Sequence, residues 1–447
     1  MPTIRELAVQ CLLQKESSVP FPVLLEQAYT KIPQSSHFIQ EKAFLMALCY
    51  GILRNAGLLK QILLPFCKKK FDAKMEICLL LALDELFFLG KEEHVSVNEY
   101  VSLCKKIQGQ QKAHAVNAIL HAVLAQKNTI KARLLEWQKH IQTKFPSNQI
   151  PNKKERRKLH LLADLPELFT KELNPALSQL LAEESFFAPV PSFRINLRNS
   201  SKETLKDKLP KNAVQLSPSI FFMENPQEKI NTNNAFFTRQ GIASALAAEK
   251  IAAFVHEKSM TNPALATAPL WDMCCGRGGK SLALLEKNIN VALATEPNEA
   301  RLDEFARECS RLCLPNPLSI QGFAEESILK SPIQKFPLIL LDSPCSTSGT
   351  IARNPEVKYR ITENSLLEIL KTQAKLLLLA STHLQKNGFL FYCTCSVFDC
   401  ENKGQIKKFL AQTPTMECLH EEYSIPSALN PALKGHDILY FAILQKK

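Results

Sequence analysis

The sequence lacks a long uninterrupted hydrophobic run. No apolar stretch in its 447 residues approaches the roughly 20 needed to cross a bilayer, since even Leu376–Ala380 is bounded by Lys375 and Ser381. The N-terminus, MPTIRELAVQCLLQKESS, also lacks the basic start and unbroken apolar centre of a signal peptide. We therefore expect no membrane partner and a cytoplasmic protein.

The sequence also lacks the cysteine spacing of structural metal sites. Its 14 cysteines are scattered along the chain without a C-x-x-C pair, and neighbours such as Cys274-Cys275 chelate poorly. Scattered cysteines in a long chain favour reduced thiols over a disulfide scaffold. We therefore predict no metal site, and a cysteine in a special environment becomes a candidate for thiol chemistry.

Positive charge, by contrast, is plentiful. The 55 Lys and Arg residues exceed the 43 Asp and Glu residues, which gives a net charge of +12. Such an excess favours a polyanionic partner through phosphate contacts, although a merely solvated basic surface would look the same. Within residues 129–164, which we interpret as a basic linker, the sequence KKERRK at Lys153–Lys158 offers either a phosphate contact or a solvated face.

The pattern of apolar residues predicts a multidomain protein. Residues 1–128 have apolar residues at helix spacing and predict an all-α bundle, with Cys78–Leu89 as its buried central helix. Residues 165–230 contain the strand-like SFRINLR and a short helix at Ser201–Leu209, as expected of a small α/β module. Residues 231–447 alternate strands and helices, which predicts a doubly wound, Rossmann-like α/β domain. Its expected strands are Leu270–Met273, Val291–Thr295, Leu338–Leu341, Phe389–Tyr392 and Leu439–Leu444.

A glycine loop follows the first of these strands. The sequence CCGRGGKS, Cys274–Ser281, stands between a strand and a helix, where backbone N–H groups can approach a polar cofactor. A phosphate-binding P-loop would need Gly at Cys274, and a dinucleotide fingerprint would need Gly at Ser281, so both are disfavoured. The next strand ends in Glu296, where a carboxylate can accept hydrogen bonds from ribose hydroxyls.

Two further motifs place thiols at strand ends. LLDSPCSTSGT, Leu340–Thr350, and FYCTCS, Phe391–Ser396, should both lie at the carboxyl edge of the sheet, where open α/β sheets bind ligands. This placement brings Asp342, Cys345 and Cys395 within reach of one cleft. Small buried cysteines and a capping Asp are the structural alternative.

Together these residues resemble the RsmB (Sun) type of small-subunit ribosomal RNA cytosine-C5 methyltransferase over nearly the whole chain. Gly276–Lys280 look like the end of its S-adenosylmethionine loop, Asp342-Ser-Pro-Cys345-Ser like its fourth motif, and Thr394-Cys395-Ser396 like its sixth. GTIARNPEVKY and Glu401-Asn402 also look like this family, and LCYGILRN and VNAIL are similar to its NusB-type RNA-binding domain. The resemblance implies a NusB-like bundle, a small RNA-binding module and a methyltransferase domain.

The resemblance also implies catalytic roles. Carbon 5 of cytosine is a poor nucleophile, so a thiolate, here Cys395, first adds to carbon 6 and forms a covalent intermediate. Asp342 would hydrogen-bond the cytosine near N3 and the exocyclic amine, and Cys345 would help to eliminate the covalent bond. The sequence shows no partner base for Cys395, so its activation by the local field is a hypothesis.

The implied cofactor is S-adenosyl-L-methionine and the implied product is 5-methylcytosine in small-subunit (16S) ribosomal RNA. Enzymes that methylate cytosine in DNA share the Pro344-Cys345 pair, but the presence of both motifs favours RNA, and no DNA partner is expected. The sequence does not identify a protein partner or an oligomeric state. The residues implied to bind the cofactor are Cys274, Cys275, Gly276, Arg277, Gly278, Gly279, Lys280, Glu296, Phe323 and Asp342.

Four departures from the family pattern leave two alternatives open. Arg277 stands where the family has Pro, Cys275-Gly276 where it has two alanines, and Gln240 where it has Asp. Phe323 replaces an Asp that contacts the adenine amine, and a phenyl ring can stack on adenine but cannot accept its hydrogen bond. The chain could thus be a degenerate, non-catalytic RNA-binding relative, or a helical scaffold that acts through its first domain alone.

Overall fold

The computed structural model describes residues 2–17, 19–67, 71–143, 153–199, 208–225, 230–231 and 234–447. The chain forms two compact units, and each contains two stretches of sequence. The first unit is Met1–Phe186 with Asn354–Ile361, and the second is Phe187–Arg353 with Thr362–Lys447. The fourfold division at residues 128, 164 and 230 stays a prediction.

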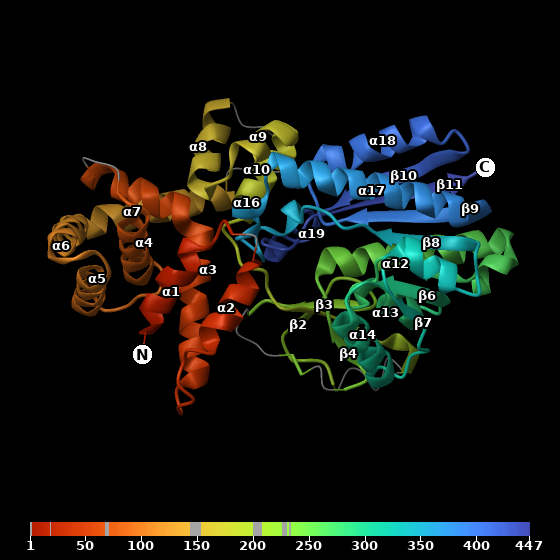
Figure 1. Ribbon diagram of the computed structural model, residues 1–447, viewed down its shortest axis with the longest axis horizontal. Helices are drawn as coiled ribbons and strands as arrows, with labels where there is room; N and C mark the ends of the chain where they lie inside the picture. The colour runs from red at the N-terminus through yellow and green to blue at the C-terminus, as the bar shows by residue number, and fades with distance from the viewer. Residues whose placement is uncertain are drawn as a thin grey trace. The chain divides into compact units, whose positions relative to one another are not determined.

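The first unit is helical throughout its described residues (Figure 1). Helix α8 and all but the first two residues of α7 lie within the range 129–164 interpreted as a basic linker, while Pro146 to Pro151 lie outside the described residues. The helices of this unit are α1 (Ile4–Leu13), α2 (Phe21–Tyr29), α3 (Phe38–Leu63), η1 (Leu64–Phe66), α4 (Ala73–Phe87), α5 (Glu93–Gln108), α6 (Gln110–Ala125), α7 (Lys127–Thr143), α8 (Lys153–Ala163), α9 (Glu167–Glu172), α10 (Pro175–Glu184) and α16 (Val357–Arg360).

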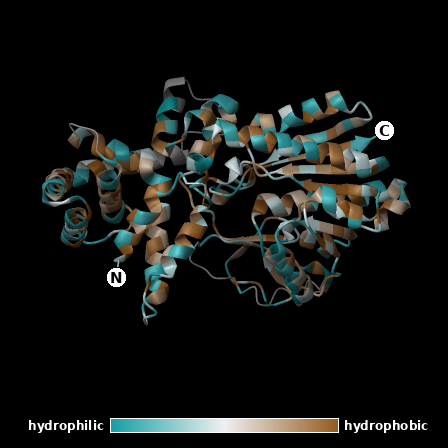
Figure 2. Ribbon diagram, viewed as in Figure 1, coloured by the Kyte–Doolittle hydropathy of each residue, from teal (hydrophilic) through white to brown (hydrophobic). Residues whose placement is uncertain are grey.

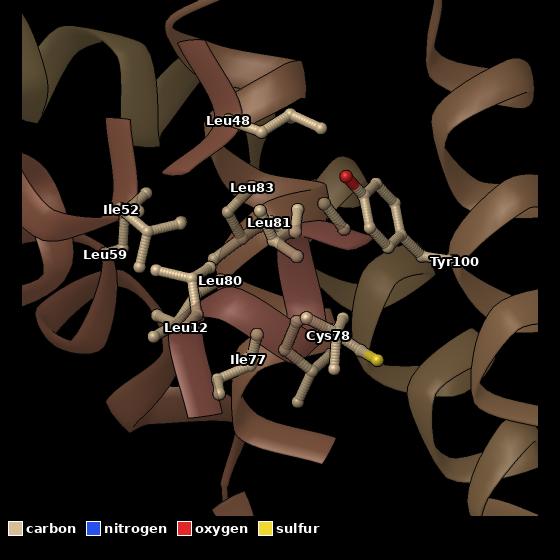
Figure 3. Close-up of a cluster of buried hydrophobic side chains, with 14 of the residues drawn as sticks. Leu12, Leu48, Ile52, Leu59, Ile77, Cys78, Leu80, Leu81, Leu83 and Tyr100 are labelled. Carbon is tan, nitrogen blue, oxygen red and sulfur yellow. The ribbon is translucent and has the colours of Figure 1, made fainter. Parts of the chain in front are cut away.

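Helix α4 forms the centre of this unit, as the apolar circumference of Cys78–Leu89 predicts. It begins after Asp72, whose carboxylate caps the helix by accepting from the backbone N–H groups of Lys74 and Met75. Its apolar side chains are buried among those of α1, α3 and α5, with Tyr100 of α5 beside them (Figure 3). Burial on all sides explains why the helix shows no polar face.

Helix α3 continues into η1, and together they are long and apolar enough to span a membrane by length and composition. Half of the most apolar window is buried inside the structure. Leu45, Leu53 and Leu59 of this helix are fully buried in the same cluster as α4. We therefore interpret α3 as a core helix of the bundle.

Helix α16 belongs to the first unit although its sequence lies far from the other helices. The Lys358 side chain is almost fully buried, and its Nζ donates to the carbonyl of Ala163 at 2.8 Å. The Tyr359 hydroxyl donates to Asp164 Oδ2 at 2.7 Å, and Lys60 donates to the same carboxylate at 3.2 Å. These contacts fix a segment of the GTIARNPEVKY motif within the helical unit.

The second unit starts with a small antiparallel sheet of strand order β2-β3-β1-β4. The predicted strand SFRINLR forms β1, whose Phe193 packs between Phe221 of β3 and Phe237 of β4. Most of the helix predicted at Ser201–Leu209 lies outside the described residues. The strands are β1 (Ser192–Ile195), β2 (Ala213–Gln215), β3 (Ile220–Met223) and β4 (Phe237–Arg239), and the turn η2 (Leu197–Asn199) follows β1.

A seven-stranded sheet of order β10-β11-β9-β8-β5-β6-β7 forms the body of the second unit. Strands β7, β6, β5, β8 and β9 are parallel, while β11 runs antiparallel to both β9 and β10. All five predicted strands are present, which confirms the Rossmann-like fold. The strands are β5 (Leu270–Asp272), β6 (Val291–Glu296), β7 (Leu318–Gln321), β8 (Phe336–Asp342), β9 (Leu384–Thr394), β10 (Met416–Ser424) and β11 (Leu439–Lys446).

Helices cover both faces of this sheet, as the alternation of strands and helices predicts. Helices α12, α13 and α14 bury their apolar side chains against one face, and α15, α17 and α18 against the other. Figure 2 shows the hydrophobic residues along the central strands between them. The helices and turns are α12 (Ile242–Thr261), η3 (Pro263–Thr267), α13 (Gly279–Glu286), α14 (Glu299–Arg311), α15 (Ala324–Ser327), η4 (Ile328–Lys330), η5 (Ser348–Thr350), α17 (Glu363–His383), η6 (Asp399–Glu401), α18 (Lys403–Gln412), α19 (Pro426–Leu429) and η7 (Pro431–Leu433).

Candidate active site

The residues predicted to form the site all lie at one edge of the seven-stranded sheet. They follow the carboxyl ends of β5, β6, β7, β8 and β9. From β5 the chain continues through β6 to β7 at one edge of the sheet, and from β8 it continues through β9 toward the other edge. The strand order therefore reverses between β5 and β8, which is the topological switch point of the sheet. Open α/β sheets bind their ligands at such a point.

The glycine loop turns sharply between β5 and α13. Gly276 and Gly278 have φ angles of +56° and +77°, a region that side chains with a Cβ rarely adopt. A Cβ on Gly278 would also lie 2.0 Å from Cδ2 of Phe305, so only glycine fits there. The loop therefore brings bare backbone, and the N-terminus of α13 at Gly279, close to the carboxyl edge of the sheet.

Asp272, the last residue of β5, was not among the predicted site residues. Its side chain is buried, and Oδ2 accepts a hydrogen bond from Ser281 Oγ at 2.6 Å. Within the described ranges Oδ1 has no hydrogen-bond partner, and burial raises the pKa of this carboxyl to about 7. A carboxylate at a strand end directly before a glycine loop was the signal in the sequence that could have identified it.

The other polar residues of the loop differ in exposure. Burial, assisted by the charge of Asp272, raises the pKa of the Cys274 and Cys275 thiols, so both stay protonated. Arg277 is mostly exposed, and its guanidinium forms an ion pair with Glu304 of α14 at 3.2 Å. The loop thus contains no reactive thiolate, and Arg277 satisfies its charge at the surface.

Glu296 and Phe323 follow the next two strands outward from β5. The Glu296 side chain is buried, and its Oε1 accepts from the backbone N–H of Asn298 at 3.1 Å and from Arg301 at 3.3 Å. Oε2 makes no hydrogen bond to the part of the chain that the structure describes, so it can accept from a ligand. Phe323 is 61% exposed at the start of α15, which leaves its ring face open to stacking.

Gln240, a departure from the family pattern, links the small sheet to the glycine loop. Its Nε2 donates to the carbonyl of Gly279 and to Ser244 Oγ, both at 3.0 Å, and its Oε1 accepts from Arg194. Arg194 is itself buried and forms an ion pair with Glu286 of α13 at 2.6 Å. An amide suits this position because it both donates and accepts.

Lys280 and Asp342 form a close ion pair across the switch point. Nζ of Lys280, from the first turn of α13, lies 2.6 Å from Oδ2 of Asp342, at the end of β8. Burial acts to lower the pKa of Lys280, but the carboxylate of Asp342 outweighs it and the pKa is raised. The ammonium therefore stays charged in a buried position beside the cysteines.

Cys345 and Cys395 lie in contact, with their Sγ atoms 3.3 Å apart. Cys345 follows β8 and Cys395 follows β9, and these strands are parallel neighbours. The hydrogen bond to Cys395, together with burial, raises the pKa of Cys345 well above its usual range. The hydrogen bond joins the two sulfurs directly, and either thiol can be its donor.

The site therefore gathers the predicted residues around two centres, the glycine loop and the thiol pair. Lys280 bridges them, because it leaves the loop and binds Asp342 beside the cysteines. Among the described residues no group of three or more His, Cys, Asp or Glu side chains is arranged to hold a metal ion. The roles assigned to individual residues stay predictions.

Two family models match separate parts of the chain. Residues 262–440 match the model described as 16S rRNA methyltransferase RsmB/F, and residues 2–125 match the NusB family. These matches confirm the NusB-like and methyltransferase parts of the resemblance, in the order predicted.

Relatives in other organisms match along nearly the whole chain. The ribosomal RNA small subunit methyltransferase B of Pasteurella multocida (strain Pm70) is 27% identical over 470 residues, which cover 99% of this chain and 96% of the relative. The protein of the same name from Xylella fastidiosa (strain 9a5c) is 24% identical and covers 92% and 93%.

Two crystal structures share the fold. PH0851 superposes with a TM-score of 0.67 at 18% identity and covers 99% of this chain and 98% of its own. A methyltransferase homolog protein from Pyrococcus horikoshii gives a TM-score of 0.52 at 20% identity and covers 66% of this chain and 100% of its own. Each of the two units therefore has a counterpart in the PH0851 chain.

Proposed function

Because this chain belongs to the RsmB/F family of S-adenosylmethionine-dependent methyltransferases, we propose that it methylates carbon 5 of a cytosine in small-subunit ribosomal RNA. The relatives that match it along their length are named for ribosomal RNA of the small subunit, and the net charge of +12 suits an RNA substrate. This substrate also places the enzyme in the cytoplasm.

The contact between Cys345 and Cys395 is the observation that carries the choice of carbon 5. A methyl group can be transferred to an oxygen or an exocyclic nitrogen without a covalent link to the enzyme, whereas carbon 5 needs a nucleophile at carbon 6. Two thiols 3.3 Å apart at the carboxyl edge, beside Asp342 and Lys280, provide that nucleophile and a second group to act on the adduct.

In the proposed reaction the Cys395 thiolate adds to carbon 6 of an unpaired or extruded cytosine. The raised pKa of Cys345 makes this residue a poor source of thiolate, which favours Cys395 for the attack. The buried ammonium of Lys280 supplies a positive field near the thiol.

Asp342 and Lys280 would act on the cytosine ring as the thiolate adds. The carboxylate of Asp342 would accept a hydrogen bond from the exocyclic amine, and Lys280 fixes the position of that carboxylate. The positive charge of Lys280 would also stabilise negative charge that develops on the cytosine ring. Cys345 would then assist the elimination that breaks the bond between Cys395 and carbon 6.

The residues of the glycine loop fit the proposed cofactor. Among the described residues Oδ1 of buried Asp272 has no partner, and the turn at Gly276 and Gly278 presents bare backbone beside it, so both can accept or donate to a polar ligand. Glu296 would accept the ribose hydroxyls, and the exposed ring of Phe323 would stack on the adenine. When bound, S-adenosylmethionine supplies an electrophilic methyl group.

The direct test is methyl transfer from labelled S-adenosylmethionine to small-subunit ribosomal RNA, with the labelled nucleotide identified after digestion. We expect 5-methylcytosine, and we expect none from a Cys395→Ala control that still binds S-adenosylhomocysteine. Cofactor binding without transfer would reject the catalytic proposal and favour the non-catalytic RNA-binding alternative. Label on another base or another atom would reject the choice of carbon 5.

A further inference from the structure

A buried carboxylate lies between the loops that carry the two thiols. Glu401 belongs to η6, which follows the Cys395 loop, and its side chain has no exposed surface. Neither Cys345 nor Cys395 is held at its sulfur by a fixed side chain other than its partner thiol within the described residues. Their separation therefore depends on what holds the two loops.

The carboxylate of Glu401 binds both loops at once. Oε1 accepts the backbone N–H of Ser346, next to Cys345, at 2.8 Å. Oε2 accepts the Ser346 hydroxyl at 2.5 Å and also the hydroxyl of Ser396, next to Cys395. One rigid group thus joins the residue that follows each cysteine.

The groups that surround the Glu401 carboxylate are hydrogen-bond donors. Gln373 of α17 donates to Oε1 at 3.0 Å, so the two oxygens accept four hydrogen bonds in all, each of them from a neutral donor of the described residues. A buried charge without a cation is expensive unless its hydrogen bonds are satisfied. A glutamine at 401 would present an NH2 group to one set of these donors and break part of the network.

We propose that Glu401 is a positioning residue that clasps the Cys345 loop to the Cys395 loop and so sets the separation of the two thiols. The proposal rests on the proposed function only for what the thiols do, not for how they are held. The clasp works through Ser346 and Ser396, and Glu401 itself does not touch the substrate.

The clasp also has an electrostatic consequence. The hydrogen bond with Cys395 and burial raise the pKa of Cys345, and the negative charge of Glu401 adds to their effect. The same residue thus fixes the distance between the thiols and favours the protonated form of Cys345. Removal of the charge alone should make Cys345 easier to deprotonate.

Disulfide cross-linking measures the separation of the thiols without RNA or cofactor. Diamide takes two electrons and two protons from a pair of touching thiols and is itself reduced to the hydrazine. We expect the wild-type protein to form a Cys345–Cys395 disulfide rapidly, with the linked peptides identified by mass spectrometry. We expect Glu401→Gln and Ser346→Ala to slow this reaction about tenfold or more, because small displacements remove most of the advantage of proximity.

The control for loss of a buried carboxylate is Glu85→Gln. Glu85 is equally buried, accepts hydrogen bonds from Ser96 and Tyr100, and belongs to the first unit. It should leave the cross-linking rate unchanged. Easier deprotonation of Cys345 in Glu401→Gln would accelerate oxidation, so a slower reaction can only report the greater distance.

Wild-type cross-linking rates in folded Glu401→Gln and Ser346→Ala would overturn the proposal. If Glu401→Gln does not fold, Ser346→Ala, which removes one hydroxyl and keeps the carboxylate, decides the outcome. The assay separates the two proposals, since failure of the wild-type protein to methylate RNA would leave the cross-linking result intact. Where methylation is observed, we expect kcat to fall in Glu401→Gln with little change in KM for RNA.

Discussion

The Sγ atoms of Cys345 and Cys395 lie 3.3 Å apart although the two residues are 50 positions apart in the sequence. The contact follows from the parallel pairing of β8 and β9, whose carboxyl ends present their loops side by side. Both sulfurs therefore lie at the same point of the carboxyl edge of the sheet.

The two thiols should respond differently to substitution. Cys395→Ala should abolish covalent adducts with RNA that contains 5-azacytidine, because no nucleophile remains for carbon 6. With RNA that contains ordinary cytosine, Cys345→Ala should allow adducts to accumulate, because the elimination that removes the proton of carbon 5 and breaks the bond to Cys395 is impaired. Cys393→Ala is the matched control, since Cys393 is a buried thiol of β9 whose pKa burial raises. Gel analysis of the adducts checks this, and the opposite pattern for the first two variants would exchange their roles.

The ion pair of Lys280 and Asp342 should matter for catalysis more than for folding. Asp342→Asn or Lys280→Met should reduce kcat for methyl transfer by about 10²–10³-fold, the usual effect of removing one charged group that stabilises a transition state. Lys287→Met serves as a control, because Lys287 forms its ion pair with Glu249 beyond the end of α13. Equal losses in all three variants would mean that a general loss of structure explains the effect.

Substitutions in the glycine loop should separate steric exclusion from backbone strain. Gly278→Ala should lower the free energy of unfolding by about 2–4 kcal/mol, because it combines a positive φ with overlap against Phe305. Gly276→Ala should lower it by only about 1–2 kcal/mol, because its φ is positive but a Cβ there meets nothing within 4 Å. Urea titration of both variants checks the order, and equal losses would show that the Phe305 overlap is relieved at little cost.

Phe323 tests the position assigned to the adenine. Phe323→Ala should weaken the binding of S-adenosylhomocysteine about three- to tenfold, because a stacked ring contributes about 0.5–1.5 kcal/mol. Leu329→Ala provides the control, since Leu329 is 76% exposed in the next turn, η4. Calorimetric titration measures both affinities. An unchanged affinity for Phe323→Ala would remove this residue from the proposed cofactor site.

Lys358 should make the stability of the helical unit depend on pH. Burial lowers its pKa to about 7, with further effects from the charges of Asp164, Lys60, Lys15 and Arg54. Between pH 7 and the ordinary lysine pKa, the unfolded chain binds more protons than the folded one, so this group makes stability rise with pH in that window.

The Lys358→Met variant removes this contribution. Its free energy of unfolding should rise less between pH 7 and 9 than that of the wild type, by at most about 1.4 kcal/mol per pH unit. Urea titrations at pH 7, 8 and 9 provide the comparison. Parallel pH profiles for the two proteins would mean that Lys358 does not titrate in this range.

The strands that the sequence predicted correctly are the buried strands of the sheet, and they in turn located the site residues. β5, β6, β8, β9 and β11 are buried along most of their length and therefore read as apolar runs, and their order placed Asp342, Cys345 and Cys395 at one edge. β7 and β10 were not predicted, because they are edge strands with exposed or charged residues that look like loops.

Other features depend on contacts between distant parts of the chain. The bond from Lys280 to Asp342 spans 62 positions and the bond from Glu401 to Ser346 spans 55, and no local pattern encodes either. Lys280 was predicted as a cofactor residue from its place in the loop alone. Its partner became visible only when the sheet placed α13 beside the end of β8.

The membership of Asn354–Ile361 in the helical unit has a consequence for biosynthesis. Met1–Phe186 leave the ribosome long before this segment does, so the bundle must wait for residue 361 before it has its full set of contacts. Until then, the Ala163 carbonyl lacks Lys358 and has to be satisfied by water, and the Asp164 carboxylate keeps its bond from Lys60 but lacks the one from Tyr359. A fragment that ends at residue 186 would lack these contacts permanently, so we expect it to be less stable than the complete helical unit.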